Sequence, residues 1–289
     1  MTRVFLVLGM ALGCATVRGI PAPEGASDAV QVPGHQAQAH YLRGRLALLD
    51  GDLDAADQAL SIARVFDPLS AWIPIAQGEV ALVRGDVQAA AAAWEEATRV
   101  DPECGAGWLF RARVDRFQGR PAAAAGHYRR ARELGVGWKA WAGEIDALVR
   151  AEQRNRAAEV MAQWALRADI SAMESAERGQ RRLLFGDHEG AGADLLPAVR
   201  SRPEDMGAVR RWVSVVLQWK DVSPALEQVD AIQANTQGSE ALFWASAVLG
   251  DAAGDDGRVS TALEAWSEID PEDEDLHALR KMLGEGRAP

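Results

Sequence analysis

The sequence is poor in cysteine, in net positive charge and in long hydrophobic runs. Its two cysteines, Cys14 and Cys104, allow at most one disulfide in 289 residues, so stability has to come from packing. A formal net charge of -11 does not provide the basic surface that general nucleic-acid binding requires. The apolar run at 4–12 is shorter than the roughly 20 residues that span a bilayer. The remaining composition, 48% hydrophobic and 25% charged, is typical of a globular protein.

Motifs that carry chemistry are also missing. There is no phosphate-binding P-loop, no GxSxG motif and no dinucleotide fingerprint. Cys104 has no recognisable base for nucleophilic catalysis, and the acidic stretch 250–257 lacks the spacing and the closing glutamate of a calcium loop. We therefore predict a protein without enzymatic activity, metal or cofactor. The histidines show no close metal-ligand spacing, and two of them, at 127 and 188, are interpreted as surface residues; the five are His35, His40, His127, His188 and His277.

The N-terminus has the layout of an export signal: Arg3, a short apolar run, and small residues around Cys14. The stretch "ALGC" resembles the lipobox of bacterial lipoproteins, and this resemblance implies that Cys14 becomes the lipidated N-terminus after removal of a signal peptide, 1–13. Residues 14–36, rich in Pro, Ala and Gly, are predicted to be a flexible tether. Ala15, where an aspartate would indicate the inner membrane, favours an outer-membrane lipoprotein facing the periplasm. Secretion without a lipid and a cytoplasmic location remain the alternatives.

The central feature of the sequence is an internal repeat. The segments "LLDGDLDAADQALSIARVFDP" from 48 and "LVRGDVQAAAAAWEEATRVDP" from 82 align, and two later segments, from 116 and 183, follow the same pattern. Apolar residues at i, i+4 and i+7 predict a helix after each Gly-Asp turn, and an earlier helix carries a small residue. The positions that recur at intervals of 34 are Gly51, Gly85 and Gly119; Ala56, Ala90 and Ala124; Ala63, Ala97 and Ala131; and Leu60, Trp94 and Tyr128.

This pattern of small and large residues resembles the tetratricopeptide repeat, which is a pair of antiparallel helices. The resemblance implies an all-α, right-handed solenoid of about six to seven helical hairpins over 37–283, forming one continuous domain with a C-terminal capping helix and a tail, 284–289. Three irregularities are expected. Gln153 replaces the turn glycine of the fourth unit, Pro197 should kink or shorten its helix, and 250–261 should lengthen the last turn.

The register of the family also implies a groove that binds partners. We expect Trp94, Trp108 and Trp266 in the core, whereas Trp72 and Trp244 fall on the groove. The arginines of the groove either bind a partner segment with acidic and apolar groups, or are solvated or paired with Glu79 and its neighbours. The predicted groove residues are Tyr41, Arg45, Trp72, Glu79, Arg113, Arg116, Phe117, Arg150, Gln180, Arg210 and Trp244.

These observations favour a protein-interaction scaffold or assembly factor, anchored by a lipid in the cell envelope. Its expected partners are envelope proteins or peptides, and we expect it to bind neither nucleic acid nor a small-molecule substrate. One alternative is an accessory or glycan-binding protein of cell-wall metabolism, which predicts paired carboxylates beside Trp72 or Trp244. A cytoplasmic regulatory repeat protein is the other alternative, if the signal is spurious.

Overall fold

The computed structural model describes residues 33–168, 170–236 and 238–285, and every regular element within these ranges is helical. The predicted signal peptide and Cys14 lie outside the described residues. The chain divides into two compact units, unit 1 up to Val160 and unit 2 from Met161. The sequence predicted one continuous domain. Because repeats contact mainly their neighbours, packing along such a stack can be divided at a single repeat, and here the division falls within one helix.

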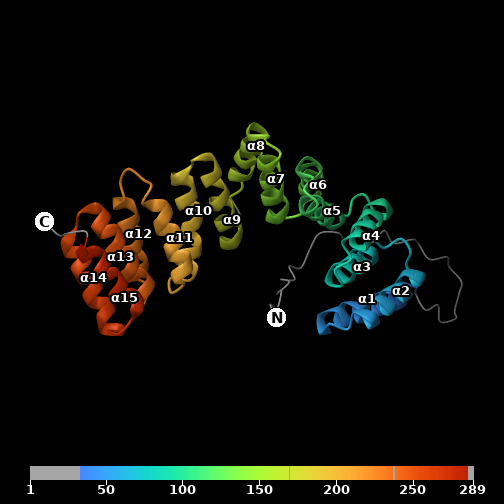
Figure 1. Ribbon diagram of the computed structural model, residues 1–289, viewed down its shortest axis with the longest axis horizontal. Helices are drawn as coiled ribbons and strands as arrows, with labels where there is room; N and C mark the ends of the chain where they lie inside the picture. The colour runs from blue at the N-terminus through green and yellow to red at the C-terminus, as the bar shows by residue number, and fades with distance from the viewer. Residues whose placement is uncertain (1–32, 169, 237, 286–289) are drawn as a thin grey trace, which may run out of the picture. The chain divides into compact units, whose positions relative to one another are not determined.

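Unit 1 is a stack of helical hairpins (Figure 1). α1 pairs with α2, α3 with α4, and α5 with α6, and α7 packs on α6. The first helix begins at Pro33, inside the predicted tether, because proline is favoured at the first position of a helix. The helices are α1 (Pro33–Asp50), α2 (Leu53–Phe66), α3 (Trp72–Val83), α4 (Val87–Val100), α5 (Gly105–Phe117), α6 (Pro121–Glu133), α7 (Trp138–Arg150) and α8 (Arg154–Ala165), which crosses into unit 2.

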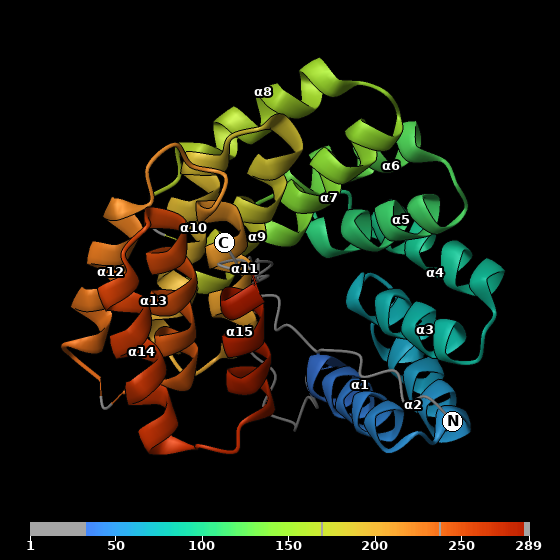
Figure 2. The ribbon, with the colours of Figure 1, turned by 60° about the vertical axis from the view of Figure 1, so that its left-hand side comes forward.

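Unit 2 continues the same helical order. α9 pairs with α10 and α13 with α14, and α15 packs on α13 and α14 (Figure 2). The order of the helices gives seven successive pairs followed by α15, in agreement with the predicted hairpins and capping helix. The elements are α9 (Ala172–Arg182), the short 3-10 helix η1 (Leu183–Phe185), α10 (His188–Ser201), α11 (Met206–Val216), α12 (Ser223–Gln233), α13 (Glu240–Ala253), α14 (Asp256–Ile269) and α15 (Glu274–Glu285).

The Gly-Asp turns have a clear physical basis. Gly51 and Gly85 adopt φ of 81° and 84°, a left-handed conformation that residues with a Cβ rarely take. The aspartate that follows each glycine caps the next helix: Oδ1 of Asp52 accepts from the Ala55 amide at 3.0 Å, and Oδ1 of Asp86 accepts from the Ala89 amide at 2.9 Å. The dipeptide thus ends the turn and begins the second helix of the hairpin.

Small and large residues pack as the repeat predicts. The alanines at the repeated positions are fully buried, and Leu60 and Trp94 are 0% and 2% exposed. A Cβ built on Gly44 would lie 2.7 Å from Cγ of Leu60, and one built on Gly78 would lie 2.3 Å from Nε1 of Trp94. The glycines therefore let the two helices of each hairpin approach until the large side chain of one lies against the backbone of the other.

Two local predictions were wrong, and one of the two outcomes predicted for Pro197 does not occur. The left-handed turn residue of the fourth hairpin is Glu152 (φ 60°), one position before Gln153, because this repeat is one residue shorter. α10 is not shortened by Pro197 and continues to Ser201. The stretch 250–261 does not lengthen the last turn, since residues 250–253 complete α13, Gly254 (φ 73°) ends it and α14 begins at Asp256.

Candidate functional site

The predicted groove residues divide between the two units, so they are described as two local sets. All eleven lie on the first helices of their hairpins. Unit 1 holds Tyr41, Arg45, Trp72, Glu79, Arg113, Arg116, Phe117 and Arg150, and unit 2 holds Gln180, Arg210 and Trp244.

The first four residues of unit 1 form one self-contained group. Arg45 on α1 and Glu79 on α3 form an ion pair, with side chains only 20% and 13% exposed. Tyr41 and Trp72 line a pocket of about 170 Å³ between the start of α1 and the start of α3. Burial raises the pKa of Tyr41, although Arg45 opposes the shift. Glu79 therefore neutralises Arg45, as the pairing alternative from the sequence proposed, and neither charge is left for a partner.

The arginines on α5 and α7 are different. Arg113 and Arg116 on α5 and Arg150 on α7 are all exposed, and within the described residues no ion pair involves them. Arg113, Arg116 and Arg150 lie near enough to the hydroxyl of Tyr128 to lower its pKa, and Asp146 on α7 acts on it in the opposite direction. Burial raises the pKa of Tyr128, and Arg116 and Arg113 lower it. Their charges therefore lie on a surface where the described structure offers them no acidic partner in an ion pair.

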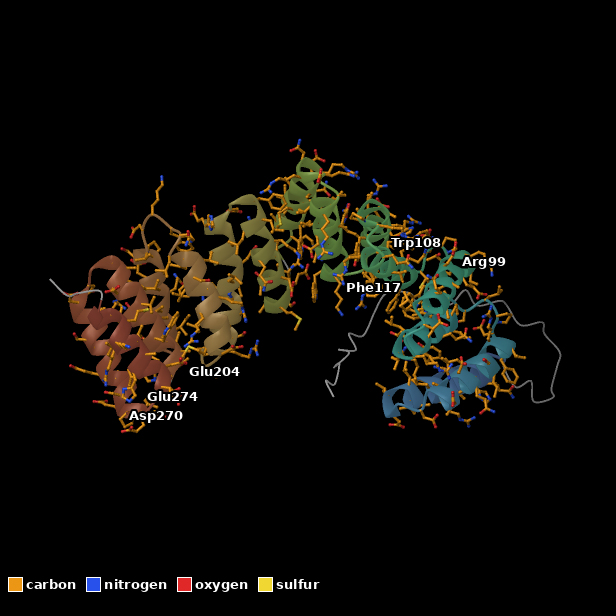
Figure 3. All side chains as sticks on the ribbon, in the orientation of Figure 1. Arg99, Trp108, Phe117, Glu204, Asp270 and Glu274 are labelled. Atoms are coloured by element: carbon orange, nitrogen blue, oxygen red, sulfur yellow. The ribbon has the colours of Figure 1, made fainter. Side chains whose placement is uncertain are left out.

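Aromatic side chains border this set of arginines. The guanidinium of Arg113 lies 5.7 Å from the ring centre of Phe110, which in turn stacks on the buried Trp94 at 5.0 Å. Phe117, at the end of α5, is 76% exposed (labelled in Figure 3). We call Arg113, Arg116, Phe117 and Arg150 the arginine cluster. It combines one exposed aromatic ring with three positive charges that form no ion pair in the part of the chain that the structure describes.

In unit 2 the predicted residues mainly hold helices together. Arg210 on α11 forms an ion pair with Asp275 on α15 at 2.8 Å, and its guanidinium lies 5.4 Å from the ring centre of Trp244 on α13. Gln180 is exposed on α9. Arg210 therefore fastens the last helix to the preceding hairpins, a role that the sequence did not indicate.

Two predictions about single residues need correction, that of Trp108 as a core residue and that of His127 as a surface residue. Trp94 and Trp266 are buried in the core as predicted, but Trp108 is only half-buried, because the inner face of α5 is filled by small residues. Its Nε1 donates to the carbonyl of Pro102 at 2.9 Å. Its ring lies 5.4 Å from that of His127, which is itself half-buried and bonded through Nδ1 to Asp115 at 2.7 Å. Burial lowers the pKa of His127, and Asp115 opposes this effect.

A buried ionic network in unit 2 was missed. Arg178 on α9 holds the carboxylate of Asp194 on α10 with two hydrogen bonds, from Nε at 2.8 Å and from Nη2 at 2.6 Å, and both side chains are under 10% exposed. Nε of Arg182 donates to the same carboxylate at 2.7 Å. The 16-residue separation of Arg178 and Asp194 equals that of Gly78 and Trp94, so the hairpin register could have indicated the contact.

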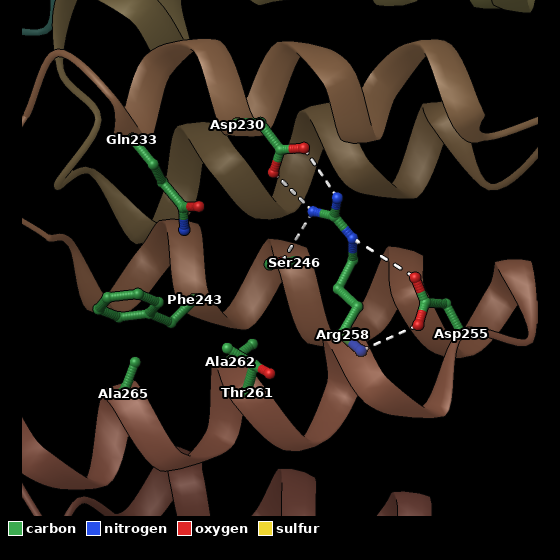
Figure 4. Close-up of a pocket in the computed structure, with 9 residues that line it drawn as sticks. All are labelled: Asp230, Gln233, Phe243, Ser246, Asp255, Arg258, Thr261, Ala262 and Ala265. Carbon is green, nitrogen blue, oxygen red and sulfur yellow. Dashed lines mark hydrogen bonds and ion pairs between the residues drawn. The ribbon is translucent and has the colours of Figure 1, made fainter.

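In a pocket of unit 2, the charged side chains pair with one another. This pocket, of about 400 Å³, lies between α12, α13 and α14 (Figure 4). Arg258 holds both carboxylate oxygens of Asp230, at 2.6 and 2.8 Å, and lies 3.9 Å from Asp255. Among the described residues no group of three metal-binding side chains comes together, and no described helix is long and apolar enough to cross a membrane. Cys104 is buried in the core of unit 1.

Comparison with known proteins shows what this architecture is similar to. Residues 75–137 match the family model of the tetratricopeptide repeat. The C-terminal part of a tetratricopeptide repeat-containing protein from Cytophaga hutchinsonii superposes with a TM-score of 0.54 at 11% identity, over 83% of this chain and 98% of that chain. A tetratricopeptide repeat protein from Parabacteroides merdae gives 0.49 at 13% identity, over 86% and 99%. The comparison with curated proteins gives no match. The chain is thus an all-α solenoid in which residues 75–137 match the tetratricopeptide repeat, and its fold is similar to that of the Cytophaga protein over 83% of its length.

Proposed function

We propose that the chain is a protein-interaction scaffold whose main contact surface in unit 1 is the arginine cluster. One observation carries the proposal: Arg113, Arg116 and Arg150 are exposed near Tyr128 and form no ion pair within the described residues, whereas Arg45 and Arg210 are paired within the protein. Tetratricopeptide repeats support a protein partner, because stacked helical repeats present extended binding surfaces.

The chemistry of the cluster defines the partner segment. Guanidinium groups hold carboxylates through paired hydrogen bonds, so acidic side chains fit Arg113, Arg116 and Arg150. Phe117 offers an exposed ring to an apolar anchor, and aromatic and arginine side chains dominate binding energy at interfaces. The segment that fits is therefore acidic with at least one large apolar residue. Its affinity should fall as salt rises, because exposed charges are screened.

Reversing the charge of the cluster should abolish partner capture. The variant combines Arg113→Glu, Arg116→Glu and Arg150→Glu, and we expect it to lose the proteins that the wild-type chain captures from detergent-solubilised membranes, because acidic side chains would repel an acidic segment. Phe117→Ala should weaken the same capture without changing its salt dependence. Captured proteins are identified and quantified by mass spectrometry.

The matched control carries the same charge change elsewhere on unit 1. Arg99, Arg129 and Arg156 lie outside the cluster and are exposed, so their combined replacement by glutamate should leave capture intact. Circular dichroism of each variant checks that it is folded. If both triple variants lose capture equally, the effect comes from overall charge; if the cluster variant still captures its partners, the cluster is not the contact surface.

We further propose that the scaffold is a lipoprotein, anchored through Cys14 to the outer membrane and facing the periplasm. The support comes from the sequence alone: a charged start, a short apolar run and "ALGC". A single acyl chain holds a protein only weakly, so stable anchoring needs more than one chain on the cysteine. Assembly of other envelope proteins is the role that such an anchored scaffold would serve.

Acyl labelling of the two cysteine variants tests the anchor. Expressed in a bacterial host with a labelled fatty acid, the wild type and Cys104→Ser should incorporate label and sediment with membranes. Cys14→Ser should do neither, because only Cys14 follows the apolar run. Equal labelling of both variants, or no labelling of the wild type, would remove the lipid anchor from the proposal while leaving the arginine cluster untouched.

A further inference from the structure

The outer face of α1 is apolar over 42–49, although α1 is the first described helix of the stack; on the first half of the helix the same face exposes His35 and Gln38. Its inner face packs against α2 and α3, with Gly44 against Leu60. On the opposite face Leu42, Leu46 and Leu49 are 52%, 60% and 60% exposed. Their i, i+4, i+7 spacing makes one continuous stripe along the helix. We call these three residues the leucine stripe.

The last described helix of unit 2, α15, has the polar outer face that is expected at the end of a helical stack. α15 buries Leu276, Leu279 and Leu283 and exposes mostly charged residues, with Met282 as its one exposed large apolar side chain. Terminal repeats of solenoids need such a polar outer face to stay soluble. α1 lacks one, and a contiguous exposed apolar stripe marks an interaction surface. The leucine stripe is therefore built to be covered by another element.

The charges beside the stripe indicate which element covers it. Arg43 and Asp50 are exposed on the same flank of α1, two helical turns apart, and within the described residues no ion pair involves either. In an antiparallel pair of identical helices, residues on the same flank meet across the seam. With a two-fold axis beside Leu46, Leu42 of each copy faces Leu49 of the other, and Arg43 of each copy lies beside Asp50 of the other.

We propose that two copies of this chain associate through the leucine stripe as an antiparallel, two-fold symmetric pair of α1 helices. Such an interface is self-complementary, as closed dimers require. Arg45 lies on the other flank, where the Arg45 side chains of the two copies would approach each other. Because Glu79 pairs with Arg45, this does not place uncompensated like charges in the seam. A standard interface buries about 800 Å² on each partner, and one helix face offers less, so the dimer should form only at raised protein concentration.

Sedimentation over a wide concentration series tests this proposal on the whole chain. The wild type should change from monomer to dimer, and Leu46→Glu should remain a monomer at every concentration, because it would bury a carboxylate at the two-fold axis. The matched control is Leu69→Glu, which adds the same charge at a residue 80% exposed outside the stripe and should dimerise like the wild type. A wild type that stays monomeric throughout, or a Leu46→Glu variant that still dimerises, would overturn the proposal.

A charge exchange tests the antiparallel register. Arg43→Asp alone and Asp50→Arg alone should each weaken dimerisation severalfold, because like charges then meet across the seam. The double variant restores opposite charges and should return the dissociation constant to near the wild-type value. A double variant as weak as the single ones would reject this register. Binding of phosphatidylglycerol vesicles by the wild type but not by Leu46→Glu, without dimers, would assign the stripe to a lipid surface instead.

Discussion

Replacing Asp194 by alanine should destabilise unit 2 by about 3–5 kcal/mol, far more than the removal of an exposed ion pair does. The carboxylate accepts two hydrogen bonds from Arg178 and one from Arg182, and the Asp194 and Arg178 side chains are 8% and 9% exposed. Without it, the guanidinium of Arg178 stays buried between α9 and α10 with no negative charge, which is far costlier than the loss of an exposed pair.

The remaining contacts of Arg178 explain why it cannot simply turn to solvent. Its Nη1 donates to the carbonyls of Trp164 and Arg167 at 3.1 and 2.8 Å. These two residues lie at the end of α8 and just after it, ahead of α9 in the chain. Ser175 donates to the backbone carbonyl of Asp194 at 2.8 Å, so the same residue also fixes the helix backbones. The ionic network thus joins three successive segments of unit 2.

Denaturant unfolding measures the effect, and hydrogen exchange of peptides from α9 and α10 locates it. Asp194→Asn keeps the volume and part of the hydrogen bonding, so its loss should be smaller than that of Asp194→Ala. The exposed control is Asp54→Ala, which removes a pair with Arg84 at 2.6 Å and should change stability little, because its side chain is 98% exposed. Equal stability of Asp194→Ala and Asp54→Ala would show that the buried network is not stabilising.

The repeat itself could be predicted because it rests on side-chain size. Gly78 and Trp94 satisfy a steric requirement that recurs along the chain, so the period of 34 identifies both the hairpins and the contact. The Gly-Asp turns were predictable for the same reason, since a left-handed residue followed by a capping aspartate leaves few alternatives. The turn of the fourth hairpin was mispredicted because this repeat is one residue shorter. A fixed period of 34 points to Gln153, whereas the left-handed residue is Glu152.

The electrostatic part of the candidate site was only half predictable. The register placed Arg45 and Arg113 on comparable faces, yet Arg45 pairs with Glu79 one repeat later, whereas Arg113 lies over Phe110. Both outcomes depend on which long side chains reach each other, and that depends on rotamers and on the depth of packing. The pattern of residue types therefore identified a set of candidates, and the three-dimensional contacts were needed to separate paired arginines from unpaired ones.

The same substitution should have opposite effects at two helical glycines of unit 1. Gly78→Ala should destabilise by about 1–3 kcal/mol, because the new Cβ would lie 2.3 Å from the indole of Trp94, a rigid side chain that is buried and held by a hydrogen bond to the Ile75 carbonyl at 3.0 Å. Gly126→Ala should instead stabilise by up to about 1 kcal/mol, because nothing lies within 4 Å of its Cβ and alanine is the better helix former.

A double-mutant cycle with Trp94 tests whether close packing is the cause. Trp94→Ala alone should cost about 3–5 kcal/mol through the cavity that it leaves. In that background Gly78→Ala no longer meets the indole, so its effect should change sign and resemble that of Gly126→Ala. Chemical unfolding of the four proteins of the cycle gives the coupling energy directly. If Gly78→Ala destabilises equally with and without the indole, the glycine is needed for its backbone conformation and not for its contact with Trp94. The steric explanation of the repeat would then fail for the hairpin of α3 and α4.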